Sequence, residues 1–325
     1  MGFAKFLGIG SSTPEKVLSN VDLEKIIDTS DEWITTRTGI KERRIAEPEV
    51  ATSDLAYEAS IKALEDAAVD VSEIDGIVLG TITPDHIFPS SACMLQSRLG
   101  AKQAFAFDLL AGCSGFLYAL HAAKGMIEGG DSKKLLVVGA ETLSKIMNYE
   151  DRSTCILFGD GAGAAVLSTS DTPGILSSCL GANGDDWDLL YMPAGGSRMP
   201  TSEETIKNRG HFLRMEGKEV FKEAVKAIQA SSLQAIEKAD LTPDQIDLFI
   251  PHQANYRILE AVRKRIGLPE EKVFSNLDKY GNTSSASVPI ALDEAVKSGR
   301  LKKGDIALFS AFGAGFTWGA AVVRW

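Results

Sequence analysis

An internal repeat constrains the fold of this chain more than any other feature of its sequence. Residues 60–67 (SIKALEDA) align with residues 232–239 (SLQAIEKA), and the alignment continues without a gap into the strand-like segments that follow, at an offset of 172. A second match, at an offset of 173, aligns Ser114 with Ser287, and the strand after it carries two inserted residues in the second copy. Because each matched unit reads helix, turn and strand, the repeat predicts two similar halves, residues 1–171 and 172–325.

The order of predicted elements places the chain in the α/β class. Segments rich in apolar and β-branched residues alternate with amphipathic segments, as in a sheet with helices packed on it. The predicted strands are 75–80, 104–110, 134–141, 164–169, 246–251, 306–312 and 319–325, and the predicted helices are 51–68, 114–128, 220–239 and 255–266. No Pro/Gly/Ser-rich linker separates the halves, so we expect them to pack as one body. The alternative is two generic βα units that share only their composition.

Length, charge and cysteine content exclude several classes of protein. A chain of 325 residues exceeds the usual range of one domain, and its net charge of −10 argues against general nucleic-acid binding. No run approaches the roughly 18 apolar residues that a membrane span needs. The N-terminal segment resembles a strand and a turn more than a signal peptide. Four cysteines without a CxxC pair and four histidines without ligand spacing predict a cytoplasmic protein with reduced thiols and no metal site.

Cys113 is the candidate nucleophile. It follows a strand-like run that ends at Leu110, and a helix begins near Ser114. The free N–H groups and the positive dipole at a helix N-terminus favour the thiolate and can hold an oxyanion, so we expect a reactive sulfur here. The remaining three cysteines lack this setting and are expected to be core residues.

Two polar residues of the second half are candidate partners of this thiol. His252 ends the apolar run FIP, and side chains at the carboxyl end of a strand are where α/β folds bind ligands. Asn282 lies in a turn (GNTSS) before a predicted helix, close to the repeat equivalent of Cys113. Each residue alone has an ordinary structural explanation. Together they predict a site where the two halves meet.

Residues 159–164 (GDGAGA) show why a glycine run alone does not predict a nucleotide site. The spacing is GxGxG rather than GxGxxG, and no acidic residue follows at the distance that a dinucleotide site requires. We therefore expect no nucleotide cofactor.

Four motifs in this order resemble one family over essentially the whole chain. The segments AGCSGF, HQAN, GNTSSAS and AFGAGFTWGAAVVRW, with DEWITTRTGIKERR and LFGDGAGAAVL, are similar to the β-ketoacyl-acyl-carrier-protein synthase III family of the thiolase superfamily. The resemblance implies a thiolase-like fold, with two pseudo-symmetric βαβαβ-type halves in a five-layered α-β-α-β-α arrangement. It agrees with the repeat found above.

The third catalytic position distinguishes the subfamilies. Thiolases use a second cysteine late in the chain, and here none follows Cys179; elongating synthases use a second histidine, and none follows His252. Cys–His–Asn remains, the set of initiating synthases and of plant-type polyketide synthases, and the latter are usually longer. A papain-type Cys–His–Asn hydrolase and a binding protein without catalytic activity are rival interpretations from other classes.

The resemblance implies a decarboxylative Claisen condensation in two half-reactions. Cys113 attacks a short acyl-coenzyme A, acetyl-coenzyme A being expected, and its own N–H with the turn at Gly313 and Gly315 holds the oxyanion. Malonyl-acyl carrier protein then loses CO₂, while His252 and Asn282 donate hydrogen bonds to the enolate oxygen. Phe312 would disfavour the charged malonyl carboxylate. Acyl-coenzyme A is a substrate, so no cofactor is implied.

The resemblance also assigns binding roles to residues along the chain. The expected coenzyme A contacts are Thr29, Trp33, Arg37, Arg152, Gly217, Phe221 and Asn255, with Trp33 and Arg152 on the two faces of the adenine. Leu143 is expected to line the acyl pocket. Phe88 is expected to reach the acyl pocket of a partner, because family members are homodimers.

A group of basic residues reverses the acidic charge of the chain locally. They lie on the predicted helix after HQAN and on the helix before it: Lys222, Arg257, Arg263, Lys264 and Arg265. Acyl carrier protein is strongly acidic, so we expect these residues to dock it. The alternative is a solvated helix face balanced by Glu260, Glu270 and Glu271.

Overall fold

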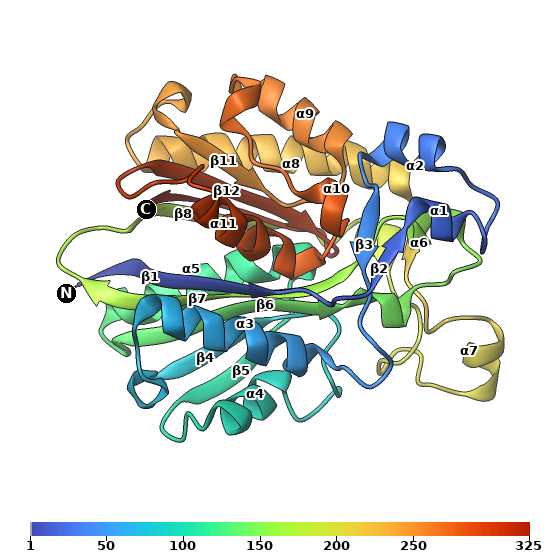
Figure 1. Ribbon diagram of the computed structural model, residues 1–325, viewed down its shortest axis with the longest axis horizontal. Coiled ribbons are helices and arrows are strands. Elements are labelled where there is room, and N and C mark those ends of the chain that lie inside the picture. Colours follow the sequence, from blue (N-terminus) through green and yellow to red (C-terminus); the bar gives the residue numbers. More distant parts are fainter. Residues whose placement is uncertain (1) are drawn as a thin grey trace.

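The chain folds into five layers, seen edge-on in Figure 1, in a computed structural model that describes residues 2–325. Two sheets are separated by a central pair of helices, α5 (Gly115–Gly129) and α11 (Ser287–Lys297). One outer layer contains α3 (Thr52–Ala67) and α4 (Ser91–Leu99), and the other contains α8 (Gly217–Lys238) and α9 (Tyr256–Ile266). The predicted α/β class and thiolase-like layering are confirmed.

The two sheets have matching strand orders. The first sheet is β1-β7-β6-β4-β5, with bounds Phe3–Ser12, Asp160–Ser170, Lys134–Thr142, Gly76–Gly80 and Phe105–Leu109. The second is β8-β13-β12-β11, with bounds Ile175–Ala182, Thr317–Arg324, Ile306–Gly313 and Leu248–Pro251. In both sheets the first three strands are antiparallel neighbours and the next is parallel. All seven predicted strands are therefore present.

The register shows that one offset relates the two halves. In the first sheet Gly76 pairs with Leu135, and in the second Leu248 pairs with Ala307, so both pairs differ by 172 residues. Helices α5 and α11 begin at positions that also differ by 172. The predicted shift to 173 and the two-residue insertion are therefore wrong, because a chance identity of serines displaced the alignment by one position.

Apolar side chains fill the space between each pair of layers. Phe116 and Leu120 of α5 and Val288 and Leu292 of α11 belong to one buried cluster between the sheets. A second cluster lies under α8 and α9, and a third lies under α3 and α4. The central layer fixes the N-termini of α5 and α11 next to each other, and this contact positions the site described below.

The glycine run at residues 159–164 serves packing. Most of it lies in the buried strand β7, and a Cβ atom on Gly163 would lie 2.6 Å from the Pro289 side chain of α11. Gly161 likewise leaves room for Ile290. Close approach of a helix to a strand thus explains these glycines.

Several short elements, most of them at one end of the molecule in Figure 1, were not predicted. Segments of two to eight residues carry little periodicity. These short elements are β2 (Val17–Ser19), α1 (Asn20–Leu23), α2 (Asp31–Thr38), β3 (Glu42–Arg44), α6 (Arg152–Cys155), β9 (Leu190–Tyr191), α7 (Glu203–Lys207), β10 (Arg214–Met215) and α10 (Leu277–Tyr280). Across residues 2–325, no helix combines the length and apolar character that crossing a bilayer would require.

Candidate active site

Cys113 lies in a turn that tertiary contacts hold in place. It is the middle residue of the 3₁₀ turn Gly112–Ser114, which leads directly into α5. The Thr317 hydroxyl at the start of β13 donates to the Ala111 carbonyl at 2.7 Å, and the Ser114 hydroxyl donates to the Thr317 carbonyl at 3.1 Å. The second half therefore holds the nucleophile of the first.

The Cys113 sulfur is a thiol at rest. The residue is 8% exposed, and burial raises the pKa of its thiol to about 12. Desolvation of the charged form therefore opposes the effect of the helix terminus, which favours the thiolate. Attack on a thioester requires the proton to leave the sulfur.

The remaining cysteines differ from one another in burial. Cys155 and Cys179 are buried, as expected, whereas Cys93 is exposed. Helix α4 covers the sheet edge with Ala92 and Leu95, whereas Cys93 lies at the rim of this contact, where its sulfur is 3.7 Å from the Ala106 carbonyl of β5. The prediction that Cys93 is a core residue is wrong.

His252 follows β11 and is held through its ring. Its Nδ1 lies 2.6 Å from the Ser287 hydroxyl of α11, and the N–H of Gln253 donates to the same hydroxyl oxygen at 3.4 Å. We assign the Ser287 hydroxyl as the donor to Nδ1. Nδ1 then carries no proton, so the ring proton is on Nε2. Burial lowers the pKa of His252 to about 3, so the neutral ring offers an Nε2–H donor.

The Asn282 amide is oriented by its neighbours. Its Oδ1 accepts a hydrogen bond from the Ser284 N–H at 2.8 Å, and its backbone pairs with Leu157 and Gly159 at 2.8 and 3.0 Å. This arrangement leaves Nδ2 available as a donor. Neutral donors of this kind suit an oxygen that gains negative charge.

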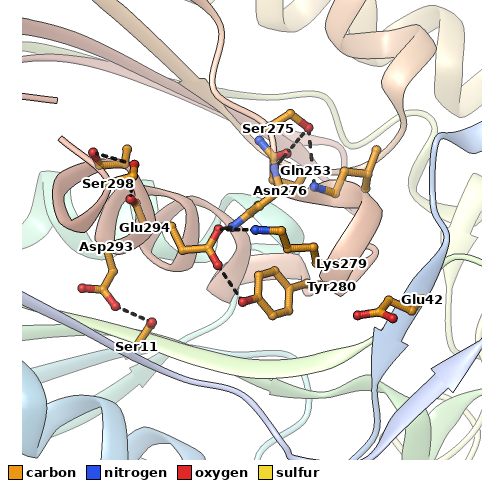
Figure 2. A network of polar contacts seen from close by, with 12 residues as sticks. Ser11, Glu42, Gln253, Ser275, Asn276, Lys279, Tyr280, Asp293, Glu294 and Ser298 are labelled. Atoms are coloured by element: carbon orange, nitrogen blue, oxygen red, sulfur yellow. Dashed lines mark hydrogen bonds and ion pairs between the residues drawn. The ribbon is translucent and has the colours of Figure 1, made fainter. Parts of the chain in front are cut away.

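A polar network joins the segments that carry these two donors (Figure 2). Gln253, next to His252, accepts hydrogen bonds from the Ser275 hydroxyl at 2.9 Å and the Asn276 N–H at 3.2 Å. The Asn276 side chain donates to Glu294 of α11 at 3.1 Å, and the Tyr280 hydroxyl donates to the same carboxylate at 2.6 Å. The network therefore fixes α10, which precedes Asn282, against α11.

Two cavities meet at the sulfur. Cys113, His252, Asn282 and Phe312 line one cavity of about 100 Å³, together with Gly217, Phe221 and Asn255. Cys113 also lines a cavity of about 370 Å³ with Leu143 and Gly315. The structure thus brings these predicted residues to the two sides of one thiol.

Gly313 lies against the nucleophile turn. A Cβ atom on Gly313 would lie 2.3 Å from the Cys113 nitrogen, so a side chain cannot be accommodated there. This close contact places the end of β12 beside the N–H that is predicted to hold an oxyanion.

Comparison with known families agrees with this geometry. The model of 3-oxoacyl-[acyl-carrier-protein (ACP)] synthase III matches residues 107–184, and the model of its C-terminal part matches residues 236–325. This chain belongs to the 3-oxoacyl-ACP synthase III family. It is thus an acyltransferase of the condensing type.

Individual relatives cover the full chain. A curated β-ketoacyl-ACP synthase III of Caldanaerobacter subterraneus is 59% identical over 99% of this chain and 98% of the relative. The crystal structure of the Aquifex aeolicus 3-oxoacyl-ACP synthase III matches with a TM-score of 0.92 and 47% identity, covering 99% of this chain and 100% of that one. A priming β-ketosynthase of the R1128 polyketide pathway matches with a TM-score of 0.93 and 40% identity, covering 99% and 96%.

Trp33 and Arg152, which the synthase III resemblance assigns to adenine, form a closed stack with Arg37, which it assigns to coenzyme A phosphate. The guanidinium groups of Arg37 and Arg152 lie 4.7 and 4.8 Å from the centroid of the Trp33 ring. Arg152 also donates to the Asp28 carbonyl at 2.7 Å. An adenine between Trp33 and Arg152 therefore requires Arg152 to move. Thr29, nearby in the chain, has a buried hydroxyl that finds no partner within residues 2–325.

Phe88 lies outside both cavities of its own chain. Its side chain is 84% exposed, and the exposed Ile87 and Leu110 are 82% and 78% accessible. Leu110 also lines the larger cavity. Exposed apolar side chains of this size are typical of a surface that a partner covers.

The five basic residues differ in their availability. Lys222 and Lys264 have side chains that are 61% and 69% exposed, and Arg257 and Arg265 are also exposed. The Arg263 side chain is only 14% exposed and holds Glu260 through two hydrogen bonds of 2.9 and 2.8 Å. Arg263 is therefore engaged within α9.

Sequence reasoning missed three polar residues next to the predicted site. Ser287 contacts His252, Ser284 contacts Asn282 and lines the larger cavity with Cys113, and Glu141 accepts a hydrogen bond from Ser284. Both serines stand in the GNTSSAS motif, and Glu141 is an acid at the end of an apolar strand. An acidic residue at that position, where ligands bind in α/β folds, was the available signal.

Proposed function

We propose that this chain joins a short acyl group from acyl-coenzyme A to malonyl-ACP, releasing CO₂ and coenzyme A and forming 3-ketoacyl-ACP. The observation that carries the proposal is the shared cavity of Cys113, His252 and Asn282, in which a thiol faces two neutral donors. The relatives' names support the same reaction class.

In the first half-reaction, Cys113 attacks the thioester carbon and the coenzyme A thiolate leaves. The Cys113 N–H and the turn at Gly313 and Gly315, which lies against it, would serve as the oxyanion site for the carbonyl oxygen as it becomes negative. Exchange between two thioesters is nearly isoenergetic, so the acyl group can remain on Cys113.

In the second half-reaction, malonyl-ACP loses CO₂ and its enolate attacks the acyl group. The His252 Nε2–H and Asn282 Nδ2 donate to the thioester oxygen, and neither has to remove a proton because CO₂ loss creates the carbanion. Phe312, 5% exposed and packed on Phe316, provides an apolar wall that favours neutral CO₂ over a carboxylate.

The binding residues follow from the cavities and their rims. Gly217, Phe221 and Asn255 line the smaller cavity, which would take the pantetheine arm. Trp33, Arg37, Arg152 and Thr29 would take the nucleotide end of coenzyme A once Arg152 moves. Leu143 would line the acyl pocket, with Phe88 of a second copy closing it in a homodimer.

We propose that acyl carrier protein docks on the exposed basic residues of α8 and α9. Lys222, Arg257, Lys264 and Arg265 offer exposed positive charge to an acidic partner, with Lys222 and Lys264 each 3.7 Å from a glutamate of their own helix. Arg263 supports α9 from within. The reaction as written uses no cofactor. The cytoplasmic location and the boundary between the halves near residue 171 stay predictions.

Intact-protein mass spectrometry after incubation with acetyl-coenzyme A tests the proposal. The wild-type chain and His252→Ala are expected to gain an acetyl group on Cys113, and Cys113→Ser is expected to gain none. His252→Ala should then fail to form product with malonyl-ACP. A stable adduct on another cysteine, with Cys113 unmodified, would exclude the assignment.

The resemblance to a priming polyketide ketosynthase supports one second candidate. Such an enzyme would perform the same condensation in another pathway. A panel of acyl-coenzyme A primers separates the two: a strong preference for acetyl supports fatty acid initiation, and a preference for longer primers supports the polyketide role.

A further inference from the structure

Arg43 is a buried cation that no step of the proposed reaction uses. It belongs to β3, and its side chain has no exposed surface. Nη1 donates to the Leu18 carbonyl at 3.0 Å and to Asn20 Oδ1 at 2.9 Å, and Nη2 donates to the Ile156 carbonyl at 2.7 Å. All three acceptors are neutral oxygens. Because burial of a charge lowers stability unless its partners offset the lost hydration, these contacts need an explanation.

One side of the Arg43 guanidinium holds α2, the helix that carries Trp33. The link runs through Asn20, whose side chain is buried. The Asn20 Nδ2 donates to the Asp31 carboxylate at the start of α2 and to the Ile40 carbonyl just beyond its end, both at 2.8 Å. Arg43 orients this amide by occupying its oxygen. It therefore fixes both ends of α2 through one side chain.

The other side of the guanidinium holds the segment that carries Arg152. Ile156, which accepts from Nη2, directly follows α6, and Arg152 is the first residue of that helix. The Arg152 guanidinium lies 4.8 Å from the centroid of the Trp33 ring. The two side chains proposed to enclose the adenine thus come from two elements that Arg43 joins. Helices α2 and α6 and strand β3 lie at the same end of the molecule (Figure 1).

The stem of Arg43 contacts a third segment, which carries Asn282. A Cβ atom on Gly159 or Gly281 would lie 3.0 or 3.4 Å from the Arg43 Cβ. The Gly159 N–H donates to the Asn282 carbonyl at 3.0 Å, and Gly281 precedes Asn282 in the chain. A lysine keeps this stem but replaces the planar fork of donors with a single ammonium, which cannot hold both elements in the same way. Arg43→Lys therefore separates the two roles of the side chain.

We propose that Arg43 is a positioning residue for coenzyme A, because it sets the spacing of α2 and α6 at which Trp33 and Arg152 receive the adenine. The side chain touches no substrate and acts through Asn20 and the backbone of α6. Malonyl-ACP carries a pantetheine arm without an adenine, so the effect is confined to the first half-reaction. The inference rests on the proposed acyl transfer from coenzyme A and adds a residue that shapes the nucleotide site.

Acylation of Cys113 in the full chain, followed by mass spectrometry at increasing thioester concentration, tests this role. Arg43→Lys is expected to raise the half-saturating concentration of acetyl-coenzyme A about ten-fold, with a maximal rate within about two-fold of wild type, as expected for the loss of one hydrogen bond from a charged group. With S-acetylpantetheine, which has no nucleotide, the variant should match wild type. Asn20→Ala, which cuts the link to α2 alone, should shift acetyl-coenzyme A in the same direction.

Two further measurements separate positioning from a general loss of stability. Decarboxylation of malonyl-ACP should stay at the wild-type rate in Arg43→Lys. Ser177→Ala is the matched control, since it removes a buried hydrogen bond of 2.6 Å to the Ala235 carbonyl in the other half, and it should acylate like wild type with both thioesters.

Unchanged half-saturation of Arg43→Lys by acetyl-coenzyme A would overturn the proposal. An equal loss with S-acetylpantetheine would overturn it as well, because the defect would then not concern the nucleotide. If Arg43→Lys fails to fold, the same comparison of two thioesters with Asn20→Ala decides. Failure of the wild-type chain to acylate with either thioester would instead contradict the proposed function.

Discussion

At the scale of single residues, the chemistry depends on which groups are kept neutral. Burial holds Cys113 as a thiol and His252 as an uncharged ring, and hydrogen bonds to Ser287 and Ser284 set which atoms donate. The residue types were predictable from their positions at strand ends and helix starts. Their protonation could not be predicted, because it depends on burial by segments distant in the chain.

The buried His252 should make stability depend on pH. Its pKa is about 3 in the folded chain and 6.5 as its ordinary value, so between these values the unfolded chain binds a proton that the folded chain does not. This contribution to the free energy of unfolding is therefore lost as pH falls below 6.5, by about 2 kcal/mol at pH 5.

Urea unfolding of wild type and His252→Gln at pH 7.5 and pH 5 measures this contribution. The variant lacks the titrating ring, so its free energy of unfolding should fall less than that of wild type. Equal falls in the two proteins would show that the ring is accessible to protons in the folded state.

At the scale of elements, short segments that carry little sequence signal position the long ones. Helices α3, α5, α8 and α9 and the seven predicted strands are present close to their predicted bounds, because each shows clear periodicity. Helix α10 has four residues and no such pattern, yet its contacts with Glu294 fix the turn that carries Asn282 (Figure 2). That dependence is visible only in three dimensions.

Removal of the Tyr280 hydroxyl should loosen this turn. Tyr280→Phe loses a hydrogen bond to a charged partner, so we expect the free energy of unfolding to fall by about 1–2 kcal/mol. Decarboxylation of malonyl-ACP should fall more than acylation of Cys113, because Asn282 serves the first process and not the second. Ser298→Ala, which removes a hydroxyl bonded to the Glu294 backbone carbonyl rather than to its carboxylate, is the matched control. Equal losses of the two activities would contradict this role.

Charge reversal on α9 should affect one substrate. Lys264→Glu with Arg265→Glu is expected to raise the KM for malonyl-ACP about ten-fold or more while acetyl transfer from coenzyme A stays unchanged, because both side chains are exposed. Arg257 is unsuitable for this test, since it lies in the same surface groove as Trp33 and Arg37. Lys133→Glu, an exposed lysine of the other half, is the control. Similar changes in both half-reactions would argue against a docking role.

At the scale of the whole molecule, the site lies where the two similar halves of the chain meet. With the offset of 172, Cys113 corresponds to Ser285 and Gly313 corresponds to Glu141, so the two helix N-termini occupy equivalent places. At the N-terminus of α5, Cys113 lies beside Gly313. At the N-terminus of α11, Ser285 contacts the buried Glu141. The repeat predicted the pairing of halves, but a one-residue alignment error concealed this correspondence until the strand register was known.

A second copy of the chain should complete the larger cavity. Phe88→Asp is expected to shift the protein from dimer to monomer in light scattering and to slow acylation, because an exposed apolar side chain is replaced by a charge. Val21→Asp, at an exposed apolar residue elsewhere, should stay dimeric. A Phe88→Asp dimer with wild-type acylation would exclude this surface as the interface.

Direct detection of the condensation product tests the central claim. The wild-type chain is incubated with acetyl-coenzyme A and malonyl-ACP, and the carrier protein is analysed by mass spectrometry. We predict acetoacetyl-ACP with wild type, and acetylated Cys113 without this product with His252→Ala. Release of free acetate without acetoacetyl-ACP would contradict the account, because it would identify a hydrolase that uses the same thiol.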